Sequence, residues 1–343
     1  MELHFTRTNG PVDDAIDRLM QMAGPVCCPD LVREMILSAL KAGVEEACEL
    51  DLKLMNSTMK EMRFTSKVFG PYRNIRKVTV FGSARTSPNE PVYEMARLLG
   101  RKLAEAGYMV ITGGGQGIMQ AINEGAGPDY SFAVNIRLPF EQKPNPVVEG
   151  NPRTITFKYF FNRKVAFLKE ASAIVLFPGG FGTLDEAMET LTLIQTGKHN
   201  PVPLVLVDEP GGTYWLKWIV FFEEELMKQG YISPSDFDLF ERVDSLSAAV
   251  RCINHFYRRY HSVRYVEKQV VIRMTSDLEQ QAVSELKEKF QDIMPPNGNM
   301  YLSRPLPEEA DEPEFAELFR LVADFNRKDF GRLRCLIDAI NSY

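Results

Sequence analysis

The sequence predicts an α/β protein with a doubly wound parallel sheet, a helical extension before it and a small α+β extension after it. From residue 75 onward, short apolar runs that are typical of buried strands alternate with segments of helical spacing. Strands that alternate with helices are joined by right-handed crossovers, which give a parallel sheet covered by helices on both faces. Before Gly70-Pro71 the pattern is helical instead, and this dipeptide breaks it.

The predicted strands of the sheet are apolar runs bounded by glycine or proline. They span residues 77–81, 108–112, 132–138, 154–157, 173–177 and 203–207. Helical spacing predicts the intervening helices at residues 91–106, 118–124, 159–170, 183–196 and 215–228. A proline-rich loop over residues 139–152 separates the third strand from the fourth.

The flanking regions follow different patterns. Residues 11–69 are expected to be helical throughout, with a long amphipathic stretch that starts at Pro29-Asp30. Beyond the sheet we expect a strand at 263–274, a helix at 278–290 and one or two helices within 314–340. The predicted domains are therefore a helical extension (1–74), the parallel-sheet domain (75–262) and a C-terminal α+β extension (263–343).

Composition excludes several classes of protein. A chain of 343 residues with 45% hydrophobic and 25% charged residues is typical of a globular protein of two to three domains. The net charge of −6 argues against a dominant nucleic-acid surface. No apolar run approaches the roughly 20 residues that span a membrane, and the N-terminus lacks a signal-peptide core, so we expect a cytoplasmic protein. The five cysteines show no paired spacing, which argues against disulfides or a zinc site.

Three glycine turns follow strands of the predicted sheet. Gly82-Ser83 follows the first strand, Gly113, Gly114 and Gly115 follow the second, and the segment PGGFGTLDE (178–186) follows the strand at 173–177. In open α/β sheets, ligands bind at the carboxyl ends of the strands, so these turns are expected to line one crevice.

The PGGFGTLDE segment has the chemistry of a phosphate site. Gly179, Gly180 and Gly182 let an anion approach the backbone, and the first N–H groups of the following helix lack internal partners. Thr183 adds a hydroxyl donor.

Arg163 and Glu186 are expected to face the same crevice from two successive helices. Arg163 lies early in the helix that follows the strand at 154–157, and Glu186 lies in the first turn of the next helix. Each residue also has a purely structural interpretation. Glu186 can be a charge that interacts favourably with the helix dipole, and Arg163 can be a solvated helix residue. The glycine turns on the same sheet edge favour the functional reading.

Two common nucleotide motifs are absent from the sequence. The turn GGGQGIM at 113–119 has Ile118 where GxGxxG requires glycine, and the first strand ends in FGSAR, so NAD or FAD binding is disfavoured. No GxxxxGK[ST] motif is present, which disfavours a P-loop NTPase.

The combination of GGGQGIM, Arg163-Lys164 and PGGFGTLDE resembles the LOG family of nucleoside 5′-monophosphate phosphoribohydrolases, often labelled "lysine decarboxylase". The resemblance covers roughly residues 75–250. The segment from Lys143-Pro144-Asn145-Pro146 to Lys164 is most similar to the longer bacterial branch, the pyrimidine/purine nucleotide 5′-monophosphate nucleosidases. Phe161-Asn162 stands where plant-type members commonly have His-Glu, which puts a cytokinin preference in doubt.

The resemblance implies a Rossmann-like enzyme that hydrolyses the N-glycosidic bond of a nucleotide such as AMP, without metal or cofactor. It implies Arg163 and Glu186 as the catalytic pair. The implied substrate-binding residues are Gly82, Ser83, Gly113, Gly114, Gly115, Lys164, Gly179, Gly180, Gly182 and Thr183. A homodimer or higher homo-oligomer is implied as well, and a regulatory nucleotide is a further expected partner.

Three other functions stay open, and a fourth is set aside. Molybdenum-cofactor carrier proteins have a similar architecture, and a carrier would not need the pair formed by Arg163 and Glu186. A cytokinin riboside 5′-monophosphate phosphoribohydrolase is the second, and a scaffolding or regulated protein that binds partners through its helical flanks is the third. The fourth, an amino-acid decarboxylase, is disfavoured because no motif identifies a lysine for a pyridoxal Schiff base.

Overall fold

The computed structural model describes residues 7–45, 48–139 and 143–343, and the chain divides into two compact units, Met1–Arg63 and Phe64–Tyr343. Residues 140–142 of the predicted proline-rich loop lie outside the described part of the chain. Within the three described ranges, no helix combines the length and the apolar character needed to cross a membrane.

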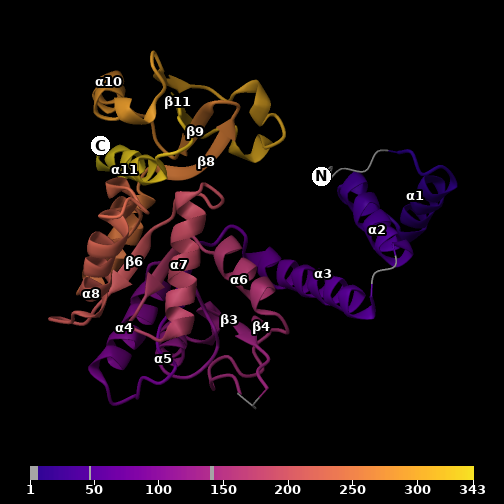
Figure 1. Ribbon diagram of the computed structural model, residues 1–343, viewed down its shortest axis with the longest axis horizontal. Helices are drawn as coiled ribbons and strands as arrows, with labels where there is room; N and C mark the ends of the chain where they lie inside the picture. The colour runs from indigo at the N-terminus through magenta and orange to yellow at the C-terminus, as the bar shows by residue number, and fades with distance from the viewer. Residues whose placement is uncertain (1–6, 46–47, 140–142) are drawn as a thin grey trace. The chain divides into compact units, whose positions relative to one another are not determined.

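The first unit consists of helices (Figure 1). They are α1 (Pro11–Ala23), α2 (Pro29–Val44) and α3 (Glu49–Phe69), whose last residues belong to the second unit. A buried ion pair between Arg33 Nη1 and Asp13 Oδ1, 3.0 Å apart, joins α1 to α2. The expectation of helix throughout residues 11–69 was wrong at the junction between these helices. Gly24 has φ 95° and Cys28 has φ 50°, both in the left-handed region that ends a right-handed helix.

The second unit contains the predicted doubly wound parallel sheet, in the order β4-β3-β2-β1-β5-β6-β7. Its strands are β1 (Lys77–Phe81), β2 (Met109–Thr112), β3 (Ser131–Ile136), β4 (Thr154–Phe157), β5 (Ala173–Leu176), β6 (Leu204–Val207) and β7 (Glu241–Val243). All neighbouring pairs are parallel, which confirms the predicted fold class. Each predicted strand is present within two residues of its expected ends, whereas β7 was not predicted.

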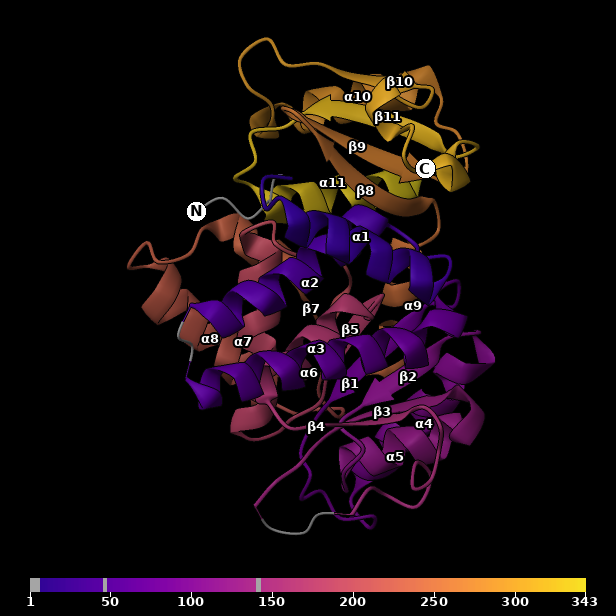
Figure 2. The same cartoon turned by 90° about the vertical axis from the view of Figure 1, so that its right-hand side faces the viewer.

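Helices cover both faces of this sheet (Figures 1 and 2). They are α4 (Pro91–Glu105), α5 (Ile118–Ala126), α6 (Phe160–Lys169), α7 (Phe181–Gln195), α8 (Tyr214–Phe221) and α9 (Leu246–Phe256). Val78 and Val80 of β1 pack with α4, α5 and α9 in one apolar cluster. The intervening residues face α6, where Thr79 donates to the carbonyl of Phe167 and the Phe81 ring lies 4.8 Å from the Phe167 ring.

The C-terminal part forms a four-stranded antiparallel sheet in the order β10-β11-β9-β8, with two helices packed on it. Its elements are β8 (Tyr260–Val266), β9 (Gln269–Met274), α10 (Gln280–Lys289), β10 (Met300–Ser303), β11 (Phe319–Asp324) and α11 (Phe330–Ser342). The single strand predicted at 263–274 is a hairpin that turns at Glu267 (φ 46°). The helical prediction for 314–340 was wrong at β11, since a short apolar run such as 321–323 suits a buried strand or a helix.

The parallel register decides where each loop lies. The carboxyl ends of β1, β2 and β5 carry the three glycine turns, and the amino ends of β1, β5 and β6 lie at the opposite edge. The domain boundary near residue 262 stays a prediction, although the antiparallel sheet begins at Tyr260.

Candidate functional site

A cavity of about 630 Å³ lies at the carboxyl edge of the parallel sheet. It is lined by Phe81, Gly82, Ser83, Ala84, Arg85, Met119, Phe160, Arg163 and the segment 179–186. Most of the predicted site residues therefore meet there: Gly82, Ser83, Arg163, Gly179, Gly180, Gly182, Thr183 and Glu186. Gly114, Gly115 and Lys164 lie outside the lining, and Gly113 borders it through Arg163.

The PGG turn, which consists of Pro178, Gly179 and Gly180, joins β5 to α7. A Cβ built on Gly179 would lie 2.1 Å from Thr183 Oγ1 and 3.0 Å from Ser83 N, so only glycine fits between these groups. The Tyr214 hydroxyl donates to the Gly179 carbonyl at 2.7 Å and holds the turn from the side of α8. Gly180 and Gly182 face open space, since a Cβ built on either meets no atom within 4 Å. The helix N-terminus is thus open to an anion in the cavity.

The GGG turn, which consists of Gly113, Gly114 and Gly115 after β2, lies next to the site. The buried Asn145 side chain donates to the Gly115 carbonyl and to Asn123 Oδ1, each at 3.0 Å, and its backbone N–H donates to the Gly114 carbonyl at 2.8 Å. No role for Asn145 is predicted from the sequence, although its place between two prolines in KPNP was a usable signal. Gly113 is the member of this turn nearest the cavity, because a Cβ there would lie 2.7 Å from Arg163 Nη2.

Arg163 lies in the first turn of α6 and is held in place by the protein. Its Nε donates to the Val134 carbonyl at 3.0 Å, and its guanidinium carbon lies 5.0 Å from the centre of the Phe167 ring and 5.9 Å from that of Phe160. Burial lowers the pKa of Arg163, and the charge of Glu186 acts in the opposite direction. A guanidinium fixed at Nε still presents its Nη atoms to a ligand.

Glu186 lies in the second turn of α7, because the helix begins at Phe181, two residues before the predicted start. Its side chain is buried, with a residue exposure of 5%, and within the described residues its Oε2 atom has no hydrogen-bond partner. Burial raises the pKa of Glu186 to about 7, against the lowering effect of the Lys164 and Arg163 charges. The carboxyl group is therefore divided between its acid and base forms near neutral pH.

Lys164 forms ion pairs with neighbouring carboxylates and does not line the cavity. Its Nζ lies 2.8 Å from both Asp185 Oδ2 and Glu189 Oε2, so it ties α6 to α7 on either side of Glu186. These ion pairs offset two negative charges that would otherwise raise the pKa of Glu186 further.

The site thus combines an anion-binding helix N-terminus, a fixed guanidinium and one buried carboxyl with a free oxygen. The carboxylate form can orient or deprotonate a water molecule and can stabilise a developing positive charge on a sugar ring. Met119, Phe160 and Phe181 add apolar surface to the lining.

Comparisons with known proteins agree with these motifs. Residues 109–253 match the family model described as "Possible lysine decarboxylase". The chain is 29% identical over 166 residues to "Cytokinin riboside 5'-monophosphate phosphoribohydrolase LOG3" of Arabidopsis thaliana. The aligned region covers 47% of this chain and 73% of that protein. It is 32% identical over 167 residues to "Probable cytokinin riboside 5'-monophosphate phosphoribohydrolase LOGL5" of Oryza sativa subsp. japonica, covering 46% and 63%.

Among solved structures, the molybdenum cofactor carrier protein of Chlamydomonas reinhardtii aligns with 52% of this chain and 96% of its own, at 18% identity and a TM-score of 0.37. The family model and the curated relatives together confirm, for the parallel-sheet part of this chain, the resemblance to the LOG family that its motifs predict.

Proposed function

We propose that this protein hydrolyses the N-glycosidic bond of nucleoside 5′-monophosphates, giving the free base and ribose 5-phosphate. The observation that carries the proposal is Glu186, a buried carboxyl with a free oxygen in the same cavity as the PGG turn and Arg163. A protein that only binds a nucleotide gains nothing from such a group, because an unsatisfied buried oxygen costs about 1–3 kcal/mol.

In the proposed reaction, the 5′-phosphate binds the N–H groups at the start of α7, next to Gly180, Gly182 and the Thr183 hydroxyl. The bond between C1′ and the base nitrogen breaks, and positive charge develops on the ribose. The Glu186 carboxylate stabilises this charge and takes a proton from water, whose oxygen bonds to C1′. The proton finally leaves with the base. Arg163 anchors the ribose phosphate or the leaving base through its Nη atoms.

The substrate class is proposed as AMP or another purine or pyrimidine monophosphate. The plant relatives are named for cytokinin riboside 5′-monophosphates, which are N6-modified adenosine monophosphates and have the same bond to cleave. By the resemblance, Phe161-Asn162 stands where plant-type members commonly have His-Glu. Phe160, which lines the cavity, is 53% exposed, and Phe161 is 48% exposed. This difference favours an unmodified base over a cytokinin.

The experiment is a panel of AMP, GMP, CMP, UMP and a cytokinin riboside monophosphate, incubated without added metal and analysed for free base and ribose 5-phosphate. We expect release from at least one monophosphate, and its loss in Glu186→Gln. Glu105→Gln, at the exposed end of α4, is the matched control and should keep full activity. Binding of a nucleotide without base release would establish a carrier instead. An unchanged rate of base release in Glu186→Gln would overturn the catalytic role of Glu186.

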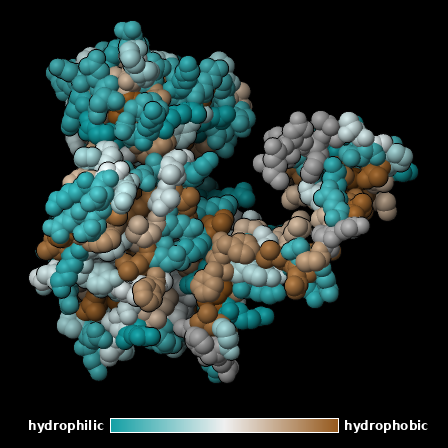
Figure 3. All heavy atoms as spheres, in the orientation of Figure 1, coloured by the Kyte–Doolittle hydropathy of each residue, from teal (hydrophilic) through white to brown (hydrophobic). Residues whose placement is uncertain are grey.

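We also propose that the protein forms a homodimer or higher oligomer through α6, α7 and α8. Apolar side chains gather at the surface over α6 and α7, as Figure 3 shows in brown. The exposed members on the three helices are Phe160, Phe161, Val165, Phe181, Met188, Leu216, Val220 and Phe221. Apolar side chains that gather at a surface are typical of a protein interface.

A further inference from the structure

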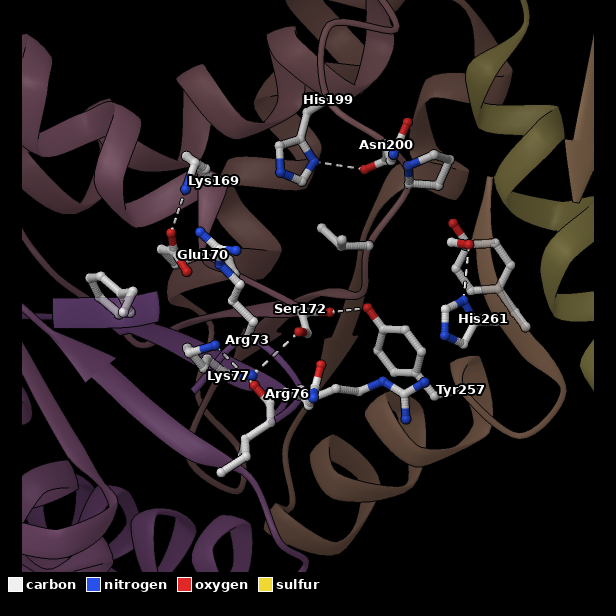
Figure 4. A pocket seen from close by; sticks show the side chains of 18 of the residues that line it. Arg73, Arg76, Lys77, Lys169, Glu170, Ser172, His199, Asn200, Tyr257 and His261 are labelled. Atoms are coloured by element: carbon white, nitrogen blue, oxygen red, sulfur yellow. Dashed lines mark hydrogen bonds and ion pairs between the residues drawn. The ribbon is translucent and has the colours of Figure 1, made fainter. Parts of the chain in front are cut away.

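A second cavity, of about 950 Å³, lies at the amino edge of the parallel sheet, opposite the candidate active site. It is lined by the end of α3, by the segments that precede β1, β5 and β6, and by Tyr257, Tyr260, His261 and Phe315 from the C-terminal region. Figure 4 shows Arg73, Arg76, Lys169 and His199 around this one space, although they come from distant parts of the sequence. Nothing in the proposed reaction uses this cavity.

The lining has a strong excess of positive charge. It contains five lysines and arginines (Arg73, Arg76, Lys77, Lys169 and Lys198) and one acidic residue, Glu170. This excess of four occurs in a chain whose net charge is −6. The C-terminal ends of α3, α6 and α7 also lie here, and each contributes about half a negative charge. More than two positive charges remain after that compensation.

Internal ion pairs account for only part of this charge. Lys169 Nζ lies 2.7 Å from Glu170 Oε1, and Lys77 Nζ donates to the carbonyls of Tyr72 and Ile75 at 2.7 and 3.0 Å. In the described residues, no carboxylate lies within 4.0 Å of the charged nitrogens of Arg73, Arg76 or Lys198.

Arg76 is held in place without an anion. Its guanidinium carbon lies 4.1 Å from the centre of the Tyr257 ring, whose hydroxyl is bonded to the carbonyl of Ser172. The two carbonyls that bind Lys77 flank Arg73 and fix the turn that presents it. Arg76 and Lys77 are thus positioned by contacts within the protein, as in a site that is largely formed before its ligand binds.

We infer that this cavity binds a small molecule with two or more phosphate groups. Two phosphate groups carry about three negative charges at neutral pH, which matches the uncompensated positive charge, whereas a single phosphate would leave part of it unmatched. Arginine suits this ligand because its planar fork binds two phosphate oxygens at once. A cavity of this size also admits a nucleoside, so the phosphates come either from a nucleotide or from an inorganic polyphosphate.

The test measures binding of inorganic tripolyphosphate and of ATP to the full chain by isothermal titration calorimetry. We expect both to bind, and both to bind at least about tenfold more weakly to the double variant Arg73→Gln/Lys198→Gln, because charged hydrogen bonds are lost. Both side chains are exposed, so the fold should be kept, as a thermal melt without ligand will show. An affinity for ATP above that for tripolyphosphate identifies a nucleotide; equal affinities identify the phosphate chain alone as the ligand.

The matched control is Arg101→Gln/Lys102→Gln, which removes the same two charges from the exposed side of α4. It should bind tripolyphosphate as the unmodified protein does. Absence of tripolyphosphate binding, an unchanged affinity in Arg73→Gln/Lys198→Gln, or an equal loss in the control would each overturn the inference. Hydrogen exchange of the unmodified protein adds an independent check: tripolyphosphate should protect 169–172 and 198–202 rather than 178–186. None of these measurements depends on hydrolysis, so their outcome is independent of whether the proposed function is correct.

Discussion

Arg163 and Glu186 act on each other by charge across the candidate active site, while the Nε atom of Arg163 is bonded elsewhere, to the Val134 carbonyl at 3.0 Å. The carboxyl therefore receives the electrostatic effect of the guanidinium at a distance. This separation leaves Glu186 Oε2 free for substrate or water, and it leaves burial as the largest influence on the carboxyl pKa.

The pH dependence of base release should report this pKa. If the Glu186 carboxylate is the working form, kcat/KM rises with pH and reaches half of its plateau near pH 7, since burial raises the pKa to about 7. An exposed glutamate would already be ionised at pH 6. The measurement is kcat/KM for the preferred monophosphate between pH 5 and 9. A rate that stays flat from pH 5.5 upward would rule out Glu186 as the base.

The same shift makes a prediction about stability. A folded-state pKa above the unfolded value means that protonated Glu186 favours folding, and this contribution is lost as the pH rises from about 4.5 to about 7. Above pH 7 the buried carboxylate costs roughly 3 kcal/mol. Glu186→Gln should therefore raise the unfolding free energy at pH 8 and change it little at pH 4.5. Urea unfolding at both values checks this, with Glu105→Gln as the control expected to show no such difference.

The contributions of the charge and of the planar shape of Arg163 can be tested with two variants. Arg163→Gln removes the positive charge, so the pKa of Glu186 rises and the midpoint of the pH profile moves to higher pH. We expect kcat/KM at pH 7.5 to fall by about 100-fold or more, as when a single charge-stabilising group is lost. Arg163→Lys keeps the charge and should keep the midpoint of the pH profile. Because it loses the planar guanidinium, its kcat/KM should stay below that of the unmodified protein. Equal midpoints in all three proteins would contradict the electrostatic link.

The residues that sequence reasoning identified are those whose chemistry is local. Gly179, Gly180 and Thr183 follow a buried strand and open a helix, and parallel strands bring such turns to one edge. The burial of Glu186 could not be predicted, because it depends on elements that are distant in sequence. The ion pairs of Lys164 to Asp185 and Glu189 also join two helices, and Lys164 lies outside the cavity that it was predicted to line.

The parts of the fold that the sequence did not predict depend on contacts distant in sequence. β11 pairs with β9 about 50 residues earlier, and its apolar run alone does not distinguish a strand from a helix. The basic cavity has the same origin, since Arg73, Lys169 and Lys198 come together only when β1, β5 and β6 align. The sequence shows only part of it, since Arg73, Arg76 and Lys77 are close in sequence, whereas Lys169 and Lys198 are far from them.

Asn145 is predicted to position the GGG turn. Asn145→Ala removes the donors to Gly115 and Asn123. The buried Gly115 carbonyl then lacks this hydrogen bond, at about 1–3 kcal/mol, whereas Asn123 Oδ1 still accepts from the Thr112 hydroxyl. We expect a lower melting temperature and a reduced kcat, because Gly113 then no longer stays fixed against Arg163. Asn89→Ala, at an exposed position, is the control. Unchanged activity in a destabilised Asn145→Ala would limit the residue to a structural role.

The proposed oligomer predicts a specific sensitivity of the apolar surface on α6, α7 and α8. Val165 on α6 and Phe221 on α8 are 49% and 50% exposed in the single chain, so a charge at either costs little in a monomer but is desolvated in an interface. Val165→Glu/Phe221→Glu should reduce the mass measured by light scattering to that of the 39.0 kDa chain.

The control for this prediction is Tyr130→Glu/Phe319→Glu, which alters two apolar side chains of similar exposure, 43% and 41%, outside that surface. It should keep the mass of the unmodified protein. A 39.0 kDa mass for the unmodified protein at micromolar concentration would refute the oligomer outright. Dissociation by the control variant, with Val165→Glu/Phe221→Glu still assembled, would place the interface on another surface, because a buried unpaired carboxylate is tolerated only where no interface forms.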